Sequence, residues 1–116
     1  QFAAIKAFDC IKNFDDIVKN YKENRDKSSK ILEKMPLLEY FIPSGAFYFY
    51  VNIEKLKIDS SAFVKKLLKD TGVALTPGID FDTLNGSKTI RISFSTDQKS
   101  LLSGLKLFYK WYKENY

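Results

Sequence analysis

The sequence predicts an α+β fold, in which helices pack on a small mixed sheet of about three strands. Stretches in which apolar residues recur about every 3.6 positions alternate with short runs of aromatic and β-branched residues. These segments follow one another in the order helix, strand, helix, strand, strand, helix, with no internal repeat and no long linker. We therefore expect the chain, residues 1–116, to form a single domain.

The first expected helix covers residues 2–34. Its apolar positions fall near a 3.6-residue period, with charged residues between them: Phe8, Ile11, Phe14 or Asp15, Val18 and Tyr21. Pro36 should end the helix, because the residue before a proline disfavours the helical conformation. Two helical segments are an alternative, since the middle of YKENRDKSSK is polar.

The first expected strand covers residues 46–53, after a turn built from Pro43, Ser44 and Gly45. Alternation along a strand would place Phe47, Phe49 and Val51 on one face. The other face would carry Tyr48, Tyr50 and Asn52. Because both sets are bulky, we expect both faces to be largely covered.

A second helix should begin near Asp59 or Ser60, either of which can cap it, and end at Gly72. Its apolar stripe consists of Phe63, Val64, Leu67 and Leu68. Residues 72–78 then read as a short strand that leads into a turn at Pro77 and Gly78.

The last strand, residues 89–95, alternates between apolar and polar side chains after a turn at Asn85 and Gly86. Ile90, Ile92 and Phe94 should face the core, and Arg91, Ser93 and Ser95 the other side. Ser95 precedes Gln98 by three residues, which is the spacing of a capping box at the start of a helix. The stripe of this helix is Leu101, Leu105, Phe108, Tyr109 and Tyr112.

The composition excludes several classes of chemistry. Histidine is absent, which rules out Ser–His and Cys–His catalysis and HExxH zinc sites, and we expect no metal site. The single cysteine, Cys10, cannot form an intrachain disulfide and is expected to be a packed or half-exposed thiol in a reducing, cytoplasmic setting. No signal peptide is recognisable, and no apolar run approaches the roughly 20 residues of a membrane-spanning helix.

The net charge of +5 raises the question of nucleic-acid binding. All but two of the 19 basic residues are lysines, and they are scattered among acids as on solvated helix faces, so we expect no nucleic-acid partner. A free-standing module that holds an acidic partner or nucleic acid through its basic surface is the alternative. The two arginines, Arg25 and Arg91, stand where a planar guanidinium could matter.

Arg91 is the leading candidate for binding chemistry. From the residues alone, a surface or ion-paired arginine is the more frequent case, but a strand would hold the side chain rigidly enough to grip a carboxylate through two parallel hydrogen bonds. Asp80 and Asp82 could form a carboxylate pair, yet acids in loops are usually solvated. The aromatic run FYFY could stack bases, although such residues more often belong to a core.

Five segments, in order and covering nearly the whole chain, resemble the C-terminal part of a fold-type I, pyridoxal-phosphate-dependent aminotransferase of class I/II, the aspartate-aminotransferase-like family. QFAAIKAF resembles the Q-x-A-A stretch of the long helix that links the large and small domains, so that residues 1–34 would be the end of that helix. The other matches are YKENRD, PSGAFYFYVNI, FVKKLLKDTGVALTPGIDF and TIRISFS.

The resemblance implies that this chain is the small domain of an enzyme that moves an amino group between an amino acid and a 2-oxo acid. Arg91 matches the arginine that binds the substrate α-carboxylate, and Gly45, with Ala46 and Phe47, would lie near the substrate entrance. The resemblance implies pyridoxal 5′-phosphate as cofactor of the full-length homodimer, with its Schiff-base lysine in a large domain before Gln1. We therefore expect no catalytic residue, and no bound cofactor, in this chain alone. Other pyridoxal-phosphate chemistry and a regulatory domain of the same fold are alternatives.

Overall fold

The computed structural model describes residues 1–10 and 14–116, and it confirms an α+β fold. Its helices are α1 (Phe2–Phe8), α2 (Phe14–Leu32), α3 (Ser60–Thr71) and α4 (Gln98–Asn115). Its strands are β1 (Glu39–Tyr40), β2 (Tyr48–Asn52), β3 (Thr76–Pro77) and β4 (Thr89–Ser93). Short 3-10 turns occur at Glu54–Leu56, Gly78–Asp80 and Gly86–Lys88.

The sheet has four strands in the order β1-β2-β4-β3, and all three pairs are antiparallel. The expectation of about three strands in a mixed sheet is therefore corrected in two respects, the number of strands and their relative directions. The additional strand, β1, contributes only Glu39 and Tyr40, which pair with Asn52 and Val51 of β2. Two residues are too few for an alternating pattern to be recognised in a sequence.

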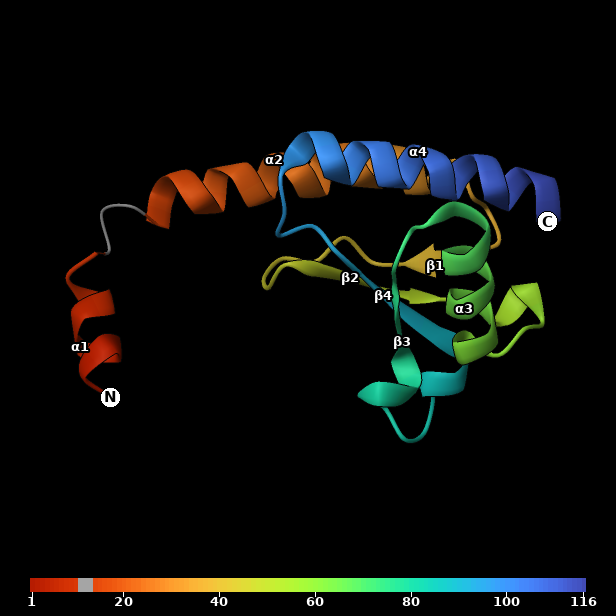
Figure 1. Ribbon diagram of the computed structural model, residues 1–116, viewed down its shortest axis with the longest axis horizontal. Helices are drawn as coiled ribbons and strands as arrows, with labels where there is room; N and C mark the ends of the chain where they lie inside the picture. Colours follow the sequence, from red (N-terminus) through yellow and green to blue (C-terminus); the bar gives the residue numbers. More distant parts are fainter. Residues whose placement is uncertain (11–13) are drawn as a thin grey trace.

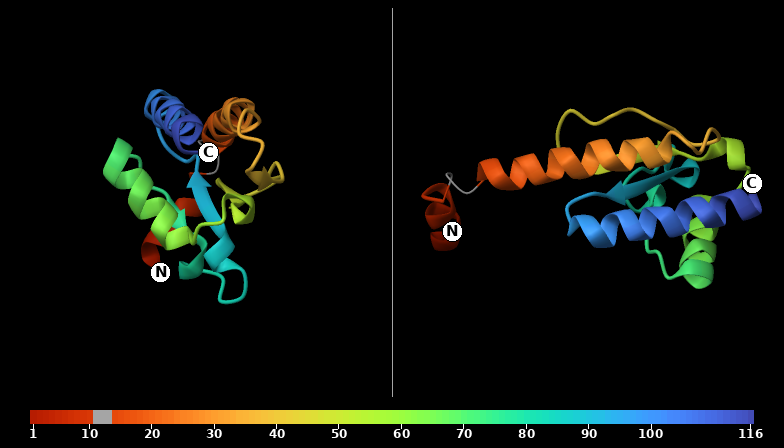
Figure 2. Two further views of the ribbon diagram at one scale, coloured as in Figure 1. Left: turned by 90° about the vertical axis from the view of Figure 1, so that its right-hand side faces the viewer. Right: turned by 90° about the horizontal axis from the view of Figure 1, so that it is seen from above.

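Two long helices, α2 and α4, lie side by side along one face of the sheet, and α3 packs against α4 (Figure 1, Figure 2). The core forms where this face meets the helices. The strands supply Phe49, Val51, Ile90 and Ile92, and the helices supply Leu32, Phe63, Leu67, Leu105 and Phe108. The predicted inward face of β4 is confirmed, since Ile90 and Ile92 are buried.

The N-terminal region forms two helices, α1 and α2, rather than one continuous helix over residues 2–34. Ile11, part of the predicted stripe, lies outside the described residues. The polar segment YKENRDKSSK, suggested as a possible break, is helical throughout. The helix α2 ends at Leu32, as expected before Pro36.

The predicted ends of α3 are confirmed. Asp59 Oδ1 accepts hydrogen bonds from the backbone N–H groups of Ser61 at 2.8 Å and Ala62 at 3.4 Å. Gly72 ends the helix with a left-handed φ of 75°, a conformation that glycine adopts at no steric cost. Leu68, however, is exposed rather than part of the buried stripe.

The predicted start of α4 is wrong in its capping residue. Asp97, not Ser95, is the N-cap, and its side chain accepts a hydrogen bond from the Ser100 N–H at 2.8 Å. Ser95 instead hydrogen-bonds Ser93. Trp111 also belongs to the buried face of α4, and its Nε1 donates to Asp70 of α3 at 2.8 Å.

Candidate functional site

The face of the sheet opposite α2 and α4 carries Arg91, as the burial pattern along β4 shows. Ile90 and Ile92 turn into the core, so Arg91 between them points the other way, half-buried. In register with it stand Tyr50 on β2 and Thr76 on β3. The expectation that both faces of β2 are covered is wrong, because 41% of Tyr50 is exposed on this face.

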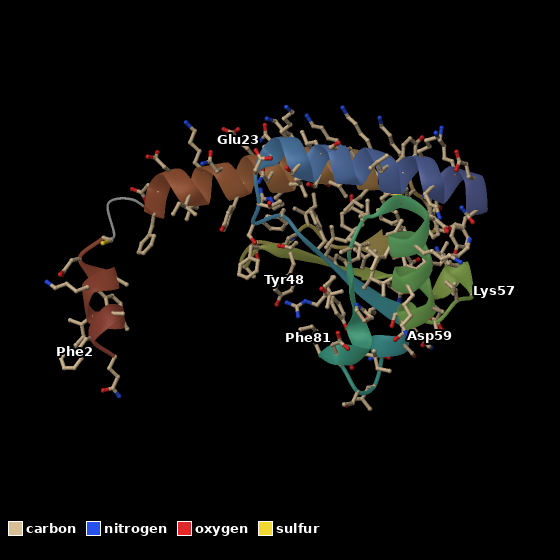
Figure 3. The ribbon with its side chains drawn as sticks, in the orientation of Figure 1. Phe2, Glu23, Tyr48, Lys57, Asp59 and Phe81 are labelled. Carbon is tan, nitrogen blue, oxygen red and sulfur yellow. The ribbon has the colours of Figure 1, made fainter. Side chains whose placement is uncertain are left out.

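The Arg91 guanidinium lies between two aromatic rings. Its central carbon is 3.9 Å from the ring centroid of Tyr48 and 3.9 Å from that of Phe81. Tyr48 begins β2, and Phe81 stands in the loop after β3 (Figure 3). Stacking on both flat faces leaves the edge of the guanidinium, where its N–H groups lie, for in-plane hydrogen bonds. Within residues 1–10 and 14–116, no ion pair or side-chain hydrogen bond engages this edge.

A hydrogen-bonded cluster of Tyr50, Asp82 and Thr89 adjoins the guanidinium. The Tyr50 hydroxyl donates to Asp82 Oδ2 at 2.9 Å and accepts from Thr89 Oγ1 at 2.9 Å. Asp82 Oδ1 accepts from the backbone N–H groups of Leu84 and Asn85, each at 2.9 Å. The cluster thus joins β2, β4 and the loop that carries Phe81.

The two acidic groups of this cluster differ in protonation at neutral pH. Backbone hydrogen bonds from Asn85 and Leu84, and then the Tyr50 hydroxyl, lower the pKa of the Asp82 carboxyl. Desolvation raises the pKa of Tyr50, against a smaller lowering by the Thr89 hydrogen bond. At neutral pH the tyrosine therefore keeps its proton and the aspartate is ionised, which suits a hydrogen bond from Tyr50 to Asp82.

Gly45 lies in the bend before β2, in a groove of about 540 Å³ that Tyr21 and Arg25 also line and Arg91 does not. Arg25 Nη1 donates to the Pro43 carbonyl at 3.1 Å, and its Nε and Nη2 donate to Asp26. The left-handed residue of this bend is Ala46, with a φ of 58°. Gly45 itself needs no glycine-specific conformation, and its predicted place at the substrate entrance stays a prediction.

The remaining candidates have structural roles or none. Cys10 is an exposed free thiol, so the prediction of a packed or half-exposed one is wrong. Asp80 and Asp82 do not form a carboxylate pair. Both oxygens of Asp82 already accept hydrogen bonds, one from the N–H groups of its own turn and the other from the Tyr50 hydroxyl. In the described part of the chain, no cluster of three or more potential metal ligands is found.

Of the aromatic run FYFY, Phe49 is fully buried in the core, while Tyr48 and Tyr50 belong to the face of Arg91. Sequence reasoning overlooked that these two tyrosines adjoin Arg91. The alternation of β2 contains that signal, since Tyr48 and Tyr50 must share the face opposite Phe49. Phe81 comes from a loop, and no pattern in the sequence indicates its contact with Arg91.

Comparison with known families decides what kind of chain this is. The sequence model for aminotransferase class I and II matches residues 1–106. The chain belongs to this family. It is 36% identical to valine–pyruvate aminotransferase from Mycobacterium tuberculosis over 96% of its own length, and 37% identical to a probable N-acetyl-LL-diaminopimelate aminotransferase from Bacillus subtilis over 90%.

Solved structures agree with this family assignment. A putative aminotransferase from Silicibacter pomeroyi superposes with a TM-score of 0.87 at 34% identity over 97% of the chain. An aromatic aminotransferase from Pyrococcus horikoshii superposes with a TM-score of 0.81 at 29% identity over 89%. The segment has the fold of part of these aminotransferases.

The matched region is a fraction of each relative. The chain spans 29% of the Mycobacterium tuberculosis enzyme and 26% of the Bacillus subtilis protein. It likewise covers 30% of the Silicibacter pomeroyi structure. Among the described residues, no helix combines the length and the apolar character that a membrane crossing requires.

Proposed function

We propose that this chain is the C-terminal small domain of a pyridoxal-phosphate-dependent aminotransferase, in which Arg91 binds the α-carboxylate of the amino acid and of the 2-oxo acid. The observation that carries the proposal is the Arg91 guanidinium itself. It is stacked between Tyr48 and Phe81, on an open face of a domain from an aminotransferase family.

The geometry suits a carboxylate because its two oxygens match the parallel N–H groups of a guanidinium edge. Stacking on both faces restricts rotation of the planar group and leaves an in-plane approach. The strand that carries Arg91 is paired on both sides, with β2 and β3, which fixes the backbone beneath the side chain. Little conformational freedom is then lost when the substrate binds.

The residues around Arg91 do not themselves fit the cofactor. Tyr48, Tyr50, Thr76 and Phe81 include no lysine that could hold pyridoxal phosphate covalently and no second cation for its phosphate. We therefore assign the cofactor, which would carry the amino group between the two substrates, to a large domain and a homodimer outside this segment. The isolated chain is expected to have no transaminase activity.

The test is Arg91→Lys in the complete protein, assayed for amino-group transfer to pyruvate from each standard amino acid. Lysine keeps the charge and loses the bidentate grip, so kcat/KM for the best donor should fall roughly a hundredfold or more. Arg25→Lys is the matched control, because Arg25 already bonds Asp26 and the Pro43 carbonyl. An unchanged kcat/KM in Arg91→Lys would remove Arg91 from the site.

A further inference from the structure

We propose that the Tyr50 hydroxyl is a positioning group for the Arg91 guanidinium, acting through Asp82 on the loop that carries Phe81. The inference rests on the proposed role of Arg91 and adds to it the means by which the guanidinium is held. Tyr50 and Arg91 are directly paired residues of β2 and β4, so both side chains leave the same face of the sheet.

The Asp82 carboxylate attaches the loop between β3 and β4 to β2 on this face. Asp82 directly follows Phe81, and its Oδ1 fixes the turn by accepting from the N–H groups of Leu84 and Asn85. Its Oδ2 accepts from the Tyr50 hydroxyl. One oxygen therefore shapes the turn and the other attaches that turn to β2.

The same loop is also held against β4. Thr89 Oγ1 lies 2.9 Å from the Tyr50 hydroxyl oxygen and 3.3 Å from the Asn85 carbonyl oxygen. At the start of the loop, Gly78 passes so close to Thr89 that a Cβ would not fit between them. These contacts fix Phe81 relative to both strands and keep its ring 3.9 Å from the guanidinium.

A general structural role for Tyr50 would look different from a positioning role. Tyr50 is 41% exposed, and the hydrogen bond from its hydroxyl to Asp82 connects its side chain to the loop. Loss of that hydroxyl should loosen the loop on its β2 side, so that Phe81 covers one face of the guanidinium less well. The result is poorer recognition of a carboxylate, and not merely an easier unfolding of the protein.

The experiment measures carboxylate recognition in the complete protein. The probes are the standard amino acid with the highest kcat/KM, with pyruvate as acceptor, and the amine that has the same side chain but no carboxylate. The ratio of the two kcat/KM values reports how strongly the enzyme recognises the carboxylate. The melting temperature of each variant is recorded beside this ratio.

Tyr50→Phe keeps the ring and removes the hydroxyl. We expect the ratio to fall about tenfold, less than the roughly hundredfold cost of a full 1 Å misplacement, mainly through a higher KM for the amino acid. Tyr112→Phe is the matched control, since the Tyr112 hydroxyl accepts from the Leu37 N–H far along the chain from Arg91. That variant should lower the melting temperature and leave the ratio unchanged.

Asp82→Asn provides a second variant that does not depend on the tyrosine ring. The amide oxygen can still accept from the Leu84 and Asn85 N–H groups, whereas the amide NH₂ can only donate to the Tyr50 hydroxyl. A weaker neutral bond then replaces the charge-assisted one that Asp82 accepts. The turn should persist while its attachment to β2 weakens, so the ratio should fall, but by less than in Tyr50→Phe.

Arg91→Lys separates this inference from the function on which it rests. If Arg91→Lys lowers the ratio and neither Tyr50→Phe nor Asp82→Asn does, the positioning role is overturned and the carboxylate site stands. If no variant changes the ratio, the proposed function falls as well. Equal losses in Tyr50→Phe and Tyr112→Phe would also overturn the inference, since they would reflect destabilisation alone.

Discussion

Phe81 covers one flat face of the Arg91 guanidinium although most of its own surface is exposed, 65% by area. Burial of hydrophobic area therefore does not explain its position. The loop contacts of Asp82 and Thr89 hold the ring there, and the attraction between the cation and the face of the ring adds about 0.5–1 kcal/mol at an exposed site. In this account, the ring serves to orient the cation and adds little to the stability of the fold.

Replacing Phe81 by leucine should weaken substrate binding modestly. The variant keeps an apolar side chain but loses the ring, so KM for the amino acid should rise roughly two- to fivefold, the equivalent of that cation–π energy. Phe81→Tyr should retain the wild-type KM. Steady-state kinetics of the complete protein checks both, with the exposed Leu84→Ala of the same loop as control. An equal KM in Phe81→Leu and in the wild type would show that the ring does not orient the arginine.

At the scale of single elements, the sequence predicted secondary structure most accurately where a local pattern, such as alternation or a cap, is clear. The alternation of β4 and the ends of α3 at Asp59 and Gly72 are confirmed. Both could be predicted because they depend on local backbone geometry. The strand β1 was missed since its two residues carry no period. The site was predictable only in part, because Phe81 reaches Arg91 through a loop whose path depends on distant contacts.

The cap of α4 shows how two local rules compete. Ser95 and Gln98 satisfy the capping-box spacing, but Asp97 accepts the backbone hydrogen bond from Ser100. The pKa of the Asp97 carboxyl is lowered first by the Ser100 side chain and then by this backbone bond. A carboxylate at a helix N-terminus also interacts favourably with the helix dipole, which a neutral hydroxyl does less well. Because the folded pKa is lowered, this stabilisation is complete above the unfolded pKa and is lost as the pH falls through the folded value.

Asp97→Ala should therefore loosen the first turn of α4 at neutral pH, and Ser95→Ala should not. Hydrogen exchange, read by mass spectrometry on a peptide that covers residues 98–105, measures this turn directly. We expect faster exchange in Asp97→Ala and wild-type exchange in Ser95→Ala. Asp97→Asn should show a smaller increase, because asparagine keeps a capping oxygen and loses the charge. Faster exchange in Ser95→Ala alone would contradict this assignment and show that Ser95 caps the helix.

At the scale of the whole molecule, α1 stands apart from the body formed by the sheet and the other helices (Figure 1, Figure 2). Its side chains Phe2, Ile5 and Phe8 are 62–89% exposed, and Ile17 and Val18 of α2 are also exposed. Surfaces of this kind normally contact another part of a protein. In the proposed enzyme, that part is the large domain.

The isolated chain should consequently self-associate through this surface. Light scattering should give a mass above 13.4 kDa that increases with concentration. A variant with serine at Phe2, Ile5 and Phe8 should move toward the monomer mass, because the exposed apolar area decreases. A native-sequence chain that remains monomeric at high concentration would contradict the assignment of this surface to a contact.

The most direct test of the account is a crystal structure of the complete protein with a bound 2-oxo acid. We predict both carboxylate oxygens within about 2.7–2.9 Å of two Arg91 guanidinium nitrogens, in the plane of that group and between the rings of Tyr48 and Phe81. A carboxylate held by other residues, with the Arg91 edge turned to solvent, would contradict it.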